Sequence, residues 1–298
     1  MTSDQYTRQD PTTQYGQRRG QPAQQQPWPG STDRMQPVPD HGEQSYRGSG
    51  RLTGRRAVVT GGDSGIGRAV ALAYAREGAD VLISYLSENA DAAQTVRLIE
   101  KAGRRAVAVP GDLTDEEHCR HVIGRAAAEL GGIDILANIA GYQMSQSDGL
   151  AGITTEQLDR VFRTNLYALF WLCQAAVGHM PPGSCIVNTA SIQAYEPSPQ
   201  LLDYASTKAA IVTFTRALAA GVADRGIRVN AVAPGAIWTP LIPTTMPPKV
   251  VESFGGHSPI GRPGQPAELA PAYVFLSSPE SSFVTGEVLA VTGGRPTT

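Results

Sequence analysis

The sequence predicts an α/β fold: a single domain in which a seven-stranded parallel sheet is covered by helices on both faces. Apolar segments of strand length alternate with segments of helical periodicity from residue 56 to residue 291, which is the pattern of strands joined by crossover helices. The strands are apolar almost throughout, as expected for a sheet that is buried on both sides. The composition does not shift after residue 50, so we expect one folded domain over residues 51–298.

Residues 1–50 differ in kind from the rest. Gln, Pro, Gly, Ser, Thr and Arg dominate them, and Leu, Ile, Phe and Cys are absent. Such a segment buries too little apolar surface to offset its ordering entropy, which predicts a flexible extension. Its tyrosines, its arginines and Trp28 could still dock on a neighbouring subunit and order part of it.

The first strand, 56–60, leads through a glycine-rich turn into a helix whose apolar residues recur at helical spacing from Ile66. Gly61 allows a sharp exit from the strand, Gly65 leaves room for a ligand against the backbone, and Gly67 lets the helix pack close to the sheet. The free amides at the helix start suit a pyrophosphate. Because the spacing is Gly-x3-Gly-x-Gly and not the common Gly-x-Gly-x-x-Gly, a purely structural turn remains an alternative.

The other elements follow in alternation. We expect strands over 79–85, 105–110, 133–139, 184–189, 228–232 and 287–291, and helices over 88–102, 115–130, 155–179, 204–223 and 265–277. In such a sheet, ligands bind beyond the carboxyl ends of the strands, at the point where the winding reverses. The loops that follow the strands are therefore the place to look for chemistry.

Two of these loops carry small and polar residues. Asp112 and Leu113 follow the third strand, and Asn138, Ala140 and Gly141 follow the fourth. A carboxylate and a small-residue turn suit an adenine amino group and a ribose, although ordinary loops also use these residues.

The fifth strand is followed by Ser191, and thirteen residues later a Tyr-x3-Lys pattern begins at Tyr204 and ends at Lys208. Positions i and i+4 share one face of a helix, so the hydroxyl and the ammonium can approach a common point. The ammonium would favour the phenolate and lower a tyrosine pKa that is otherwise about 10, which would make Tyr204 a proton-transfer group at neutral pH. The pattern is short, and an ordinary Tyr and Lys on a helix surface would also produce it.

The order of these pieces along the chain is more specific than any one of them. It runs from the Thr60-Gly-x3-Gly-Ile-Gly turn through Asp112, Asn138-x-Ala-Gly, Asn165 within Thr-Asn-Leu, Ser191 and Tyr204-x3-Lys208 to Pro234-Gly235. Over about residues 50–294 this order closely resembles the short-chain dehydrogenase/reductase family, which implies a Rossmann-type three-layer sandwich. The Thr-Gly-Gly-Asp-Ser-Gly-Ile-Gly turn, a following Ile-Ser-Tyr-Leu and the polar extension resemble a subgroup of bacterial stress-associated members.

The resemblance implies an oxidoreductase that transfers hydride between a nicotinamide dinucleotide and a carbonyl/alcohol substrate such as an aldehyde, a ketone or a sugar alcohol. Tyr204 would be the acid or base at the substrate oxygen, and Ser191 would hydrogen-bond the same oxygen. Lys208 would hold the cofactor's ribose hydroxyls and keep the pKa of Tyr204 low. Asn165 resembles the residue that binds a water linking Lys208 to solvent, or it satisfies backbone groups only.

The resemblance also implies a cofactor site. Pro234–Thr239 resembles the turn beneath the nicotinamide, and the substrate loop occupies about residues 236–260, where Trp238, Met246 and Phe254 suggest a partly apolar pocket or burial in the core. The implied cofactor-binding residues are Gly61, Asp63, Ser64, Gly65, Ile66, Gly67, Tyr85, Asp112, Leu113, Asn138, Ala140, Gly141, Tyr204, Lys208, Pro234, Gly235, Ile237 and Thr239.

The choice between NAD and NADP depends on the end of the second strand. No Asp stands there to engage a ribose 2′-hydroxyl, and Asp63-Ser64 replaces the Arg or Lys that NADP-dependent members place before the second glycine. Asp63 and Glu88 would repel a 2′-phosphate, which favours NAD. Arg68 could reach that phosphate, but its position inside the helix disfavours this.

Composition excludes other classes of function. A net charge of −2 offers no electrostatic footprint for nucleic acid or an anionic membrane. Three cysteines without CxxC spacing and five histidines without HExxH indicate neither a disulfide framework nor a metal site. No apolar run approaches the ~20 residues of a membrane span, and no secretory leader is visible, so we expect a cytoplasmic protein.

The expected partners are a small-molecule substrate and further copies of the chain. The two long helices, 155–179 and 204–223, are more apolar than solvent-facing helices, and together with the C-terminal strand region they resemble the family's tetramer contacts. A homotetramer is expected first and a dimer next. Two rival functions stay open: a catalytically silent dinucleotide-binding regulator or scaffold, and a protein whose extension is the working part. Nothing in the sequence indicates a dehydratase or epimerase.

Overall fold

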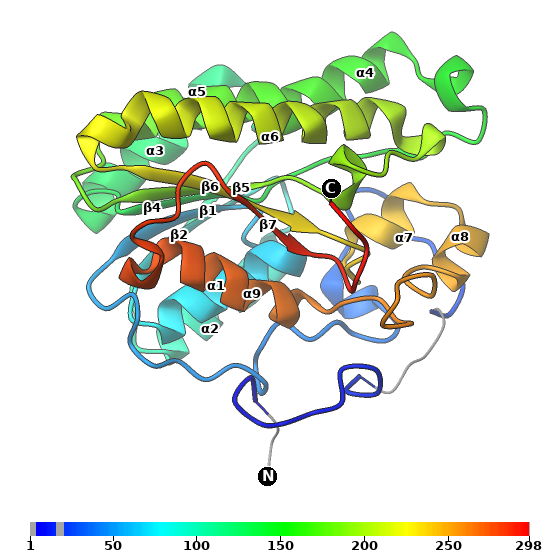
Figure 1. Cartoon of the computed structure of the whole chain (residues 1–298), viewed down its shortest axis with the longest axis horizontal. Helices are drawn as coiled ribbons and strands as arrows, with labels where there is room; N and C mark the ends of the chain where they lie inside the picture. Colours follow the sequence, from blue (N-terminus) through cyan, green and yellow to red (C-terminus); the bar gives the residue numbers. More distant parts are fainter. Residues whose placement is uncertain (1–3, 16–20, 298) are drawn as a thin grey trace.

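The computed structural model describes residues 4–15 and 21–297. It confirms a seven-stranded sheet whose strands are all parallel, in the spatial order β3-β2-β1-β4-β5-β6-β7 (Figure 1). The winding reverses between β1 and β4, which places the ligand edge at their carboxyl ends. The strands are β1 (Arg56–Thr60), β2 (Asp80–Tyr85), β3 (Ala106–Pro110), β4 (Ile135–Asn138), β5 (Cys185–Thr189), β6 (Arg228–Pro234) and β7 (Val288–Val291).

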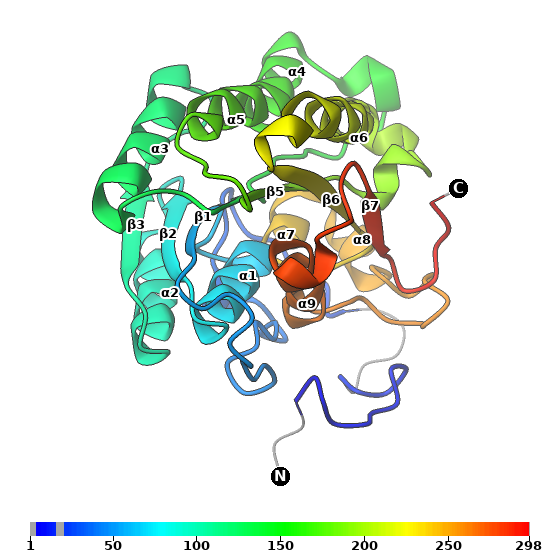
Figure 2. The same ribbon diagram turned by 60° about the vertical axis from the view of Figure 1, so that its left-hand side comes forward.

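Helices cover both faces of the sheet, as Figures 1 and 2 show. One layer holds α1 (Gly65–Arg76), α2 (Asn89–Lys101) and α9 (Pro266–Ser277), and the other holds α3 (Glu116–Leu130), α4 (Thr155–Phe162), α5 (Ala168–Val177) and α6 (Leu202–Val222). Two short helices, α7 (Leu241–Thr245) and α8 (Pro248–Glu252), lie in the substrate loop. The 3₁₀ turns are η1 (Thr32–Arg34), η2 (Gly149–Gly152), η4 (Ile192–Ala194), η5 (Pro199–Leu201), η6 (Ala223–Arg225) and η7 (Pro279–Ser281).

The apolar strands build two cores, one on each face. Val58 and Leu82 pack with the α3–α5–α6 layer, whereas Val59 and Ile83 pack with the α1–α9 layer. This division follows from the alternation of side chains along a strand. All four side chains are fully buried, and burying each one stabilises the fold by roughly 1.5–3 kcal/mol. The sheet edge that carries the site is therefore a rigid support.

The long helix expected over 155–179 is interrupted. A π-helical turn, η3 (Arg163–Tyr167), separates α4 from α5, and Asn165 lies within it. The Asn165 amide accepts from the Tyr142 N–H at 2.7 Å and donates to the Tyr142 carbonyl at 2.8 Å. The extra residue of the π turn directs this side chain toward the loop after β4, and these bonds compensate for the disturbed helix ladder.

The extension differs from the expected flexible tail, because its described residues 21–50 pack against the domain. Met35 is 1% exposed and joins Trp238, Ile242 and Val251 in a small apolar cluster. The indole N–H of Trp238 donates to the Pro37 carbonyl at 2.8 Å. A few apolar side chains are enough to hold this segment, because the domain supplies the apolar residues against which they pack. The composition of the segment alone does not reveal these contacts. Residues 1–3 and 16–20 lie outside the described part.

Two further findings concern residues 4–15 and 21–297. No helix in these ranges combines the length and the hydropathy that crossing a membrane requires. Cys119, Cys173 and Cys185 are buried and free, and burial raises the thiol pKa of Cys119 and Cys173 to about 12. These two thiols therefore carry almost no nucleophilic thiolate at neutral pH.

Candidate active site

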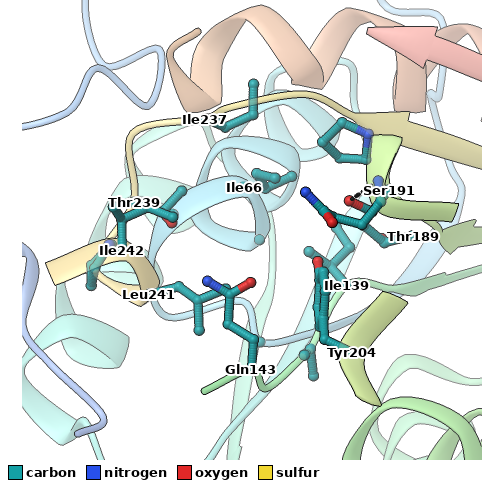
Figure 3. A pocket seen from close by; sticks show the side chains of 18 of the residues that line it. Ile66, Ile139, Gln143, Thr189, Ser191, Tyr204, Ile237, Thr239, Leu241 and Ile242 are labelled. Carbon is teal, nitrogen blue, oxygen red and sulfur yellow. Dashed lines mark hydrogen bonds between the residues drawn. The ribbon is translucent and has the colours of Figure 1, made fainter. Parts of the chain in front are cut away.

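A cavity of about 600 Å³ opens at the carboxyl edge of the sheet (Figure 3). Its wall combines the glycine turn, the ends of β2 to β6, the first turns of α6 and the substrate loop. In Figure 3, Ser191 and Tyr204 lie on one side of this space, and Thr239 lies on the other. The cavity is lined by all the residues predicted for the cofactor except Asn138, and by all the predicted catalytic residues except Asn165.

The glycine turn brings backbone segments into close contact. Gly61 and Gly65 adopt positive φ angles of 64° and 49°, which a residue with a side chain rarely adopts. A Cβ on Gly67 would lie 1.8 Å from the Gly61 carbonyl oxygen, and one on Gly65 would lie 3.1 Å from the Thr239 side chain. Only glycine fits at these positions. The N-terminus of α1 thereby reaches the cavity wall beside Thr239, where its free amides attract an anion.

The end of the cavity near β2 is acidic. Asp63 is 4% exposed, and burial, with a smaller contribution from Glu88, raises the pKa of its carboxyl to about 7. Arg68 does not line the cavity: it is 1% exposed, pairs with Asp91 at 3.1 Å and donates to the Asp63 carbonyl oxygen at 2.8 Å. Arg68, the cation that the sequence offered for a 2′-phosphate, is thus already paired with Asp91.

Asp112 lies at the end of β3, also in the cavity wall. One of its carboxylate oxygens accepts from the Thr114 N–H at 2.9 Å, and the other lies 3.7 Å from the Arg160 guanidinium. The carboxylate is part exposed, so it keeps acceptor capacity for a ligand such as an adenine amino group.

Ser191, Tyr204 and Lys208 converge on the opposite side. Ser191 follows β5, and its hydroxyl accepts from the Gln193 N–H at 3.1 Å. Tyr204 and Lys208 lie one turn apart on α6, with the ammonium nitrogen 5.4 Å from the centre of the phenol ring. Lys208 donates to the Thr189 carbonyl at 2.8 Å, and its burial lowers its pKa to about 7. All three residues line the cavity.

The expected low pKa of Tyr204 is wrong for this arrangement. Burial raises the pKa of its phenol to about 12, and the nearby Ser191 hydroxyl only partly opposes this. Desolvation penalises the phenolate. Moreover, an amine whose own pKa is about 7 is only partly charged at neutral pH, so Lys208 offers the phenolate less stabilisation than a full ammonium would.

Two predicted site residues lie beneath the cavity and not in its wall. The Asn138 amide donates to the Asn188 side chain at 2.9 Å, so it joins β4 to β5. The side chain of Asn165 is engaged by Tyr142 and also donates to the Thr207 hydroxyl at 3.1 Å. A second cavity of about 10 Å³ touches Asn165 and Lys208, which is close to the space of one water.

The substrate loop splits between core and cavity. Trp238 is fully buried in the apolar cluster, whereas Met246 and Phe254 line the cavity. Sequence reasoning missed other wall residues, since loops that carry no motif supply most of them: Trp28, Pro29, Gln143, Arg160, Gln193, Ser198, His257 and Arg295. Of these residues, Gln143 could most readily have been predicted from the sequence, because it closely follows the Asn138–Gly141 turn.

Known proteins resemble this chain over most of its length. The family model described as "Enoyl-(Acyl carrier protein) reductase" matches residues 61–295. The "Uncharacterized oxidoreductase YghA" of Escherichia coli is 55% identical over 290 residues, 96% of this chain and 97% of that one. "General stress protein 39" of Bacillus subtilis is 48% identical over 267 residues, 90% and 93% of the two chains. The "Glucose and ribitol dehydrogenase" of Daucus carota is 44% identical over 279 residues, 92% and 96%.

Solved structures agree as well. A short-chain dehydrogenase from Burkholderia cenocepacia, in complex with NADP, superposes with a TM-score of 0.77 at 36% identity and covers 82% of this chain and 98% of that one. The family model alone spans well over half of the chain, and the relatives span nearly all of it. The chain therefore belongs to the short-chain dehydrogenase/reductase family of NAD(P)-dependent oxidoreductases.

Proposed function

We propose that this protein interconverts a carbonyl and its alcohol (CH–OH) by hydride transfer with a nicotinamide dinucleotide, with Tyr204 as the proton donor or acceptor. One observation carries the proposal: Tyr204, Ser191 and Lys208 meet in the wall of the same cavity that the glycine turn borders. The dinucleotide, when bound, supplies or accepts the hydride. A catalytically silent scaffold has no need for these three side chains together.

The residues divide the work at the substrate oxygen. Ser191 and Tyr204 line the same cavity, and their hydroxyls can both donate to a carbonyl oxygen placed between them. A phenol whose pKa is about 12 is protonated at neutral pH, which suits an acid in the direction of reduction. Lys208, one turn away, is placed to hold ribose hydroxyls. The small cavity beside Asn165 supports a water that connects Lys208 onward.

The cavity fits a dinucleotide. The amides at the start of α1 would hold the pyrophosphate, because glycines at 61, 65 and 67 leave the backbone open there. Asp112 and Leu113 would receive the adenosine end. The turn from Pro234 to Ile237 would lie against the nicotinamide.

The acidic residues that line the cavity favour NAD, whereas a solved relative binds NADP. Glu88 and the partly ionised Asp63 both line the cavity, and Arg68 is engaged by Asp91, so a 2′-phosphate would meet repulsion without a compensating cation from Arg68. On these residues NAD remains our proposal. The named relatives do not support it, since the Burkholderia structure holds NADP. Titration with both dinucleotides decides, and a lower dissociation constant for NADP would replace the proposal.

We propose a small polar carbonyl or polyol as substrate. The cavity offers Gln143, Gln193, Ser198 and His257 as hydrogen-bonding groups, beside the apolar Met246 and Phe254. The carrot relative is named for glucose and ribitol. The test is a panel of aldehydes, ketones, sugars, sugar alcohols and an enoyl thioester, followed at the nicotinamide absorbance. Turnover of a carbonyl or an alcohol supports the proposal. Turnover of the enoyl thioester alone, or of nothing while a dinucleotide still binds, contradicts it.

We also propose a cytoplasmic homotetramer in which residues 1–50 form an extension on a domain over 51–298. Tyr167 and Phe170 on the α5 side are 44% and 43% exposed, and Phe170 packs against Phe214 of α6 at 4.5 Å between ring centroids. Such an apolar face suits a subunit contact. The buried, free cysteines suit a reducing compartment. Sedimentation equilibrium measures the assembly, and a monomer at micromolar concentration would contradict it.

A further inference from the structure

The N-terminal extension contributes to the cavity. Trp28 and Pro29 belong to the cavity wall, together with the glycine turn and Tyr204. The family model begins at residue 61, so this part of the wall lies outside it. The aromatic ring of Trp28 packs edge-on against Tyr142, with 4.8 Å between ring centroids. A segment that sequence composition predicts to be a tail thus supplies a large aromatic side chain to the site.

The segment is anchored on one side of the cavity to the substrate loop. The Gln26 N–H donates to the Pro243 carbonyl of α7 at 3.0 Å. Gly30 lies so close to α7 that a Cβ there would be 2.6 Å from the Thr244 side chain, and its φ of 89° also requires glycine. The helix α7 directly follows Thr239, whose side chain lies against Gly65 of the glycine turn.

On the other side the segment is anchored to α2. The Thr32 N–H donates to the Asp91 carboxylate at 2.9 Å, and Thr32 is 3% exposed. Asp91 pairs with Arg68, which in turn donates to the Asp63 carbonyl of the glycine turn. Each anchor is therefore linked to the glycine turn through a neighbouring residue, Thr239 on one side and Arg68 on the other, and the segment between the anchors lines the same cavity as the turn.

Trp28 itself is held by packing. Its indole N–H is buried and finds no acceptor within the described part of the chain. Lifting the ring would therefore break no hydrogen bond within the described part of the chain, whereas the backbone on either side stays anchored. The glycine turn beneath is the place where a dinucleotide's pyrophosphate would lie.

We propose that residues 26–32 form a strap over the bound dinucleotide and that the Trp28 ring covers its central part, so that the cofactor leaves only when this ring moves. The proposal rests on the proposed function, because it requires a dinucleotide in the cavity. The consequence is kinetic: the strap slows cofactor release and so lowers the dissociation constant.

The test is the release rate of NADH and NADPH from the full-length protein. Displacement by excess oxidised dinucleotide is followed in a stopped-flow instrument through nicotinamide fluorescence. Trp28→Ala removes the ring and should speed release about tenfold, with a matching rise in the dissociation constant. Trp28→Phe keeps an aromatic cover and should stay within about threefold of the parent protein. Gly30→Val should also speed release, because its side chain forces the strap away from Thr244.

Matched variants distinguish a strap over the cofactor from a contact that only stabilises the fold. Gln25→Ala, at an exposed position of the same segment, should release the cofactor at the parent rate. Unchanged release in both Trp28→Ala and Gly30→Val overturns the strap, as does an effect on the substrate KM alone. A lowered melting temperature without faster release shows a merely structural role and also overturns it. A parent protein that binds neither dinucleotide would instead contradict the proposed function.

Discussion

The two ends of the cavity both bury titratable groups, but different ones: a phenol and an amine at the catalytic end, and a carboxyl at the adenosine end. At the catalytic end, burial lowers the pKa of the Lys208 amine to about 7 and raises that of the Tyr204 phenol to about 12. At the adenosine end, burial raises the pKa of the Asp63 carboxyl to about 7. All three shifts favour the uncharged form. The fold thus prepares one end for proton transfer, whereas at the other end the charge that would repel a phosphate comes from Glu88 and, above about pH 7, from Asp63.

The difference also lies in what holds each end. Ser191, Tyr204 and Lys208 are placed by β5 and α6, both packed into the core. The adenosine end depends on long-range partners, since Arg68 is engaged by Asp91, and Asp91 also anchors the strap. We therefore expect changes at the adenosine end to affect the choice of cofactor more than they affect catalysis.

Among the changes outside Tyr204, Lys208→Met should produce the largest loss. We expect kcat/KM to fall about 10³-fold, because the amine placed beside the phenol and the ribose is gone. The dissociation constant for the dinucleotide should rise as well. Lys101→Met, at the exposed end of α2, is the matched control. A loss below tenfold would remove Lys208 from the mechanism.

Ser191→Ala should cost about 10²-fold in kcat, the usual value of one hydrogen-bond donor at a developing charge. The dinucleotide dissociation constant should stay within about twofold, because Ser191 is assigned to the substrate oxygen. Ser206→Ala, which removes an exposed hydroxyl on α6, should behave like the parent protein. Equal kcat in Ser191→Ala and Ser206→Ala would contradict the role.

Asp63→Asn should stabilise the ligand-free protein at neutral and alkaline pH. The folded carboxyl, with a pKa of about 7, keeps its proton to a higher pH than the unfolded one, whose pKa is 3.8. Stability therefore falls as pH rises through this window, and the Asn variant avoids the fall. We expect a gain of roughly 2 kcal/mol at pH 8 that vanishes near pH 4. Urea unfolding at both values measures it, and equal gains at both would contradict the buried acid.

Lys208 should give the opposite slope. Its folded pKa of about 7 lies below the unfolded value of 10.5, so the unfolded state binds more protons between these values and the parent protein gains stability as pH rises. Lys208→Met removes this dependence. After allowing for the lost hydrogen bond to Thr189, we expect the variant to be more stable by roughly 2 kcal/mol at pH 7 and by little at pH 10. An equal difference in unfolding free energy between the variant and the parent protein at both pH values would show that the amine is exposed to water and would contradict its lowered pKa.

Glu88→Gln should have the smallest effect. Removing a carboxylate beside the adenosine end should lower the ratio of the dissociation constants for NADP and NAD about threefold. Glu100→Gln, an exposed acid farther along α2, serves as the control. An unchanged ratio would show that the acid does not face the 2′ position.

The sequence was sufficient for the sheet and the catalytic wall because both follow short-range patterns. The segment 56–60 coincides with β1, and Tyr204 and Lys208 needed only helical spacing to meet. What it could not show depends on contacts between distant residues. The π turn at Asn165 serves Tyr142, and Asn138 turns to Asn188 on the neighbouring strand.

The same dependence on distant contacts explains why the sequence did not predict the packing of the extension or the pKa of Tyr204. Met35 and Trp28 are too few apolar side chains for composition to predict packing. Each nevertheless packs against the domain, Met35 with Trp238 and Trp28 with Tyr142. The raised pKa of Tyr204 could not be foreseen either. Helical spacing predicts proximity to Lys208, but the extent of desolvation follows only from the surrounding walls.

The central claim is that Tyr204 transfers the proton in a cavity that independently holds the dinucleotide. The most direct measurement compares Tyr204→Phe with the parent protein in two assays: turnover of the best substrate of the panel, and fluorescence titration with dinucleotide. We expect kcat to fall at least about 10³-fold while the dissociation constant stays within about twofold. Tyr167→Phe, an exposed tyrosine on the neighbouring helical segment, should change neither quantity. Turnover by Tyr204→Phe at the parent rate would contradict the account.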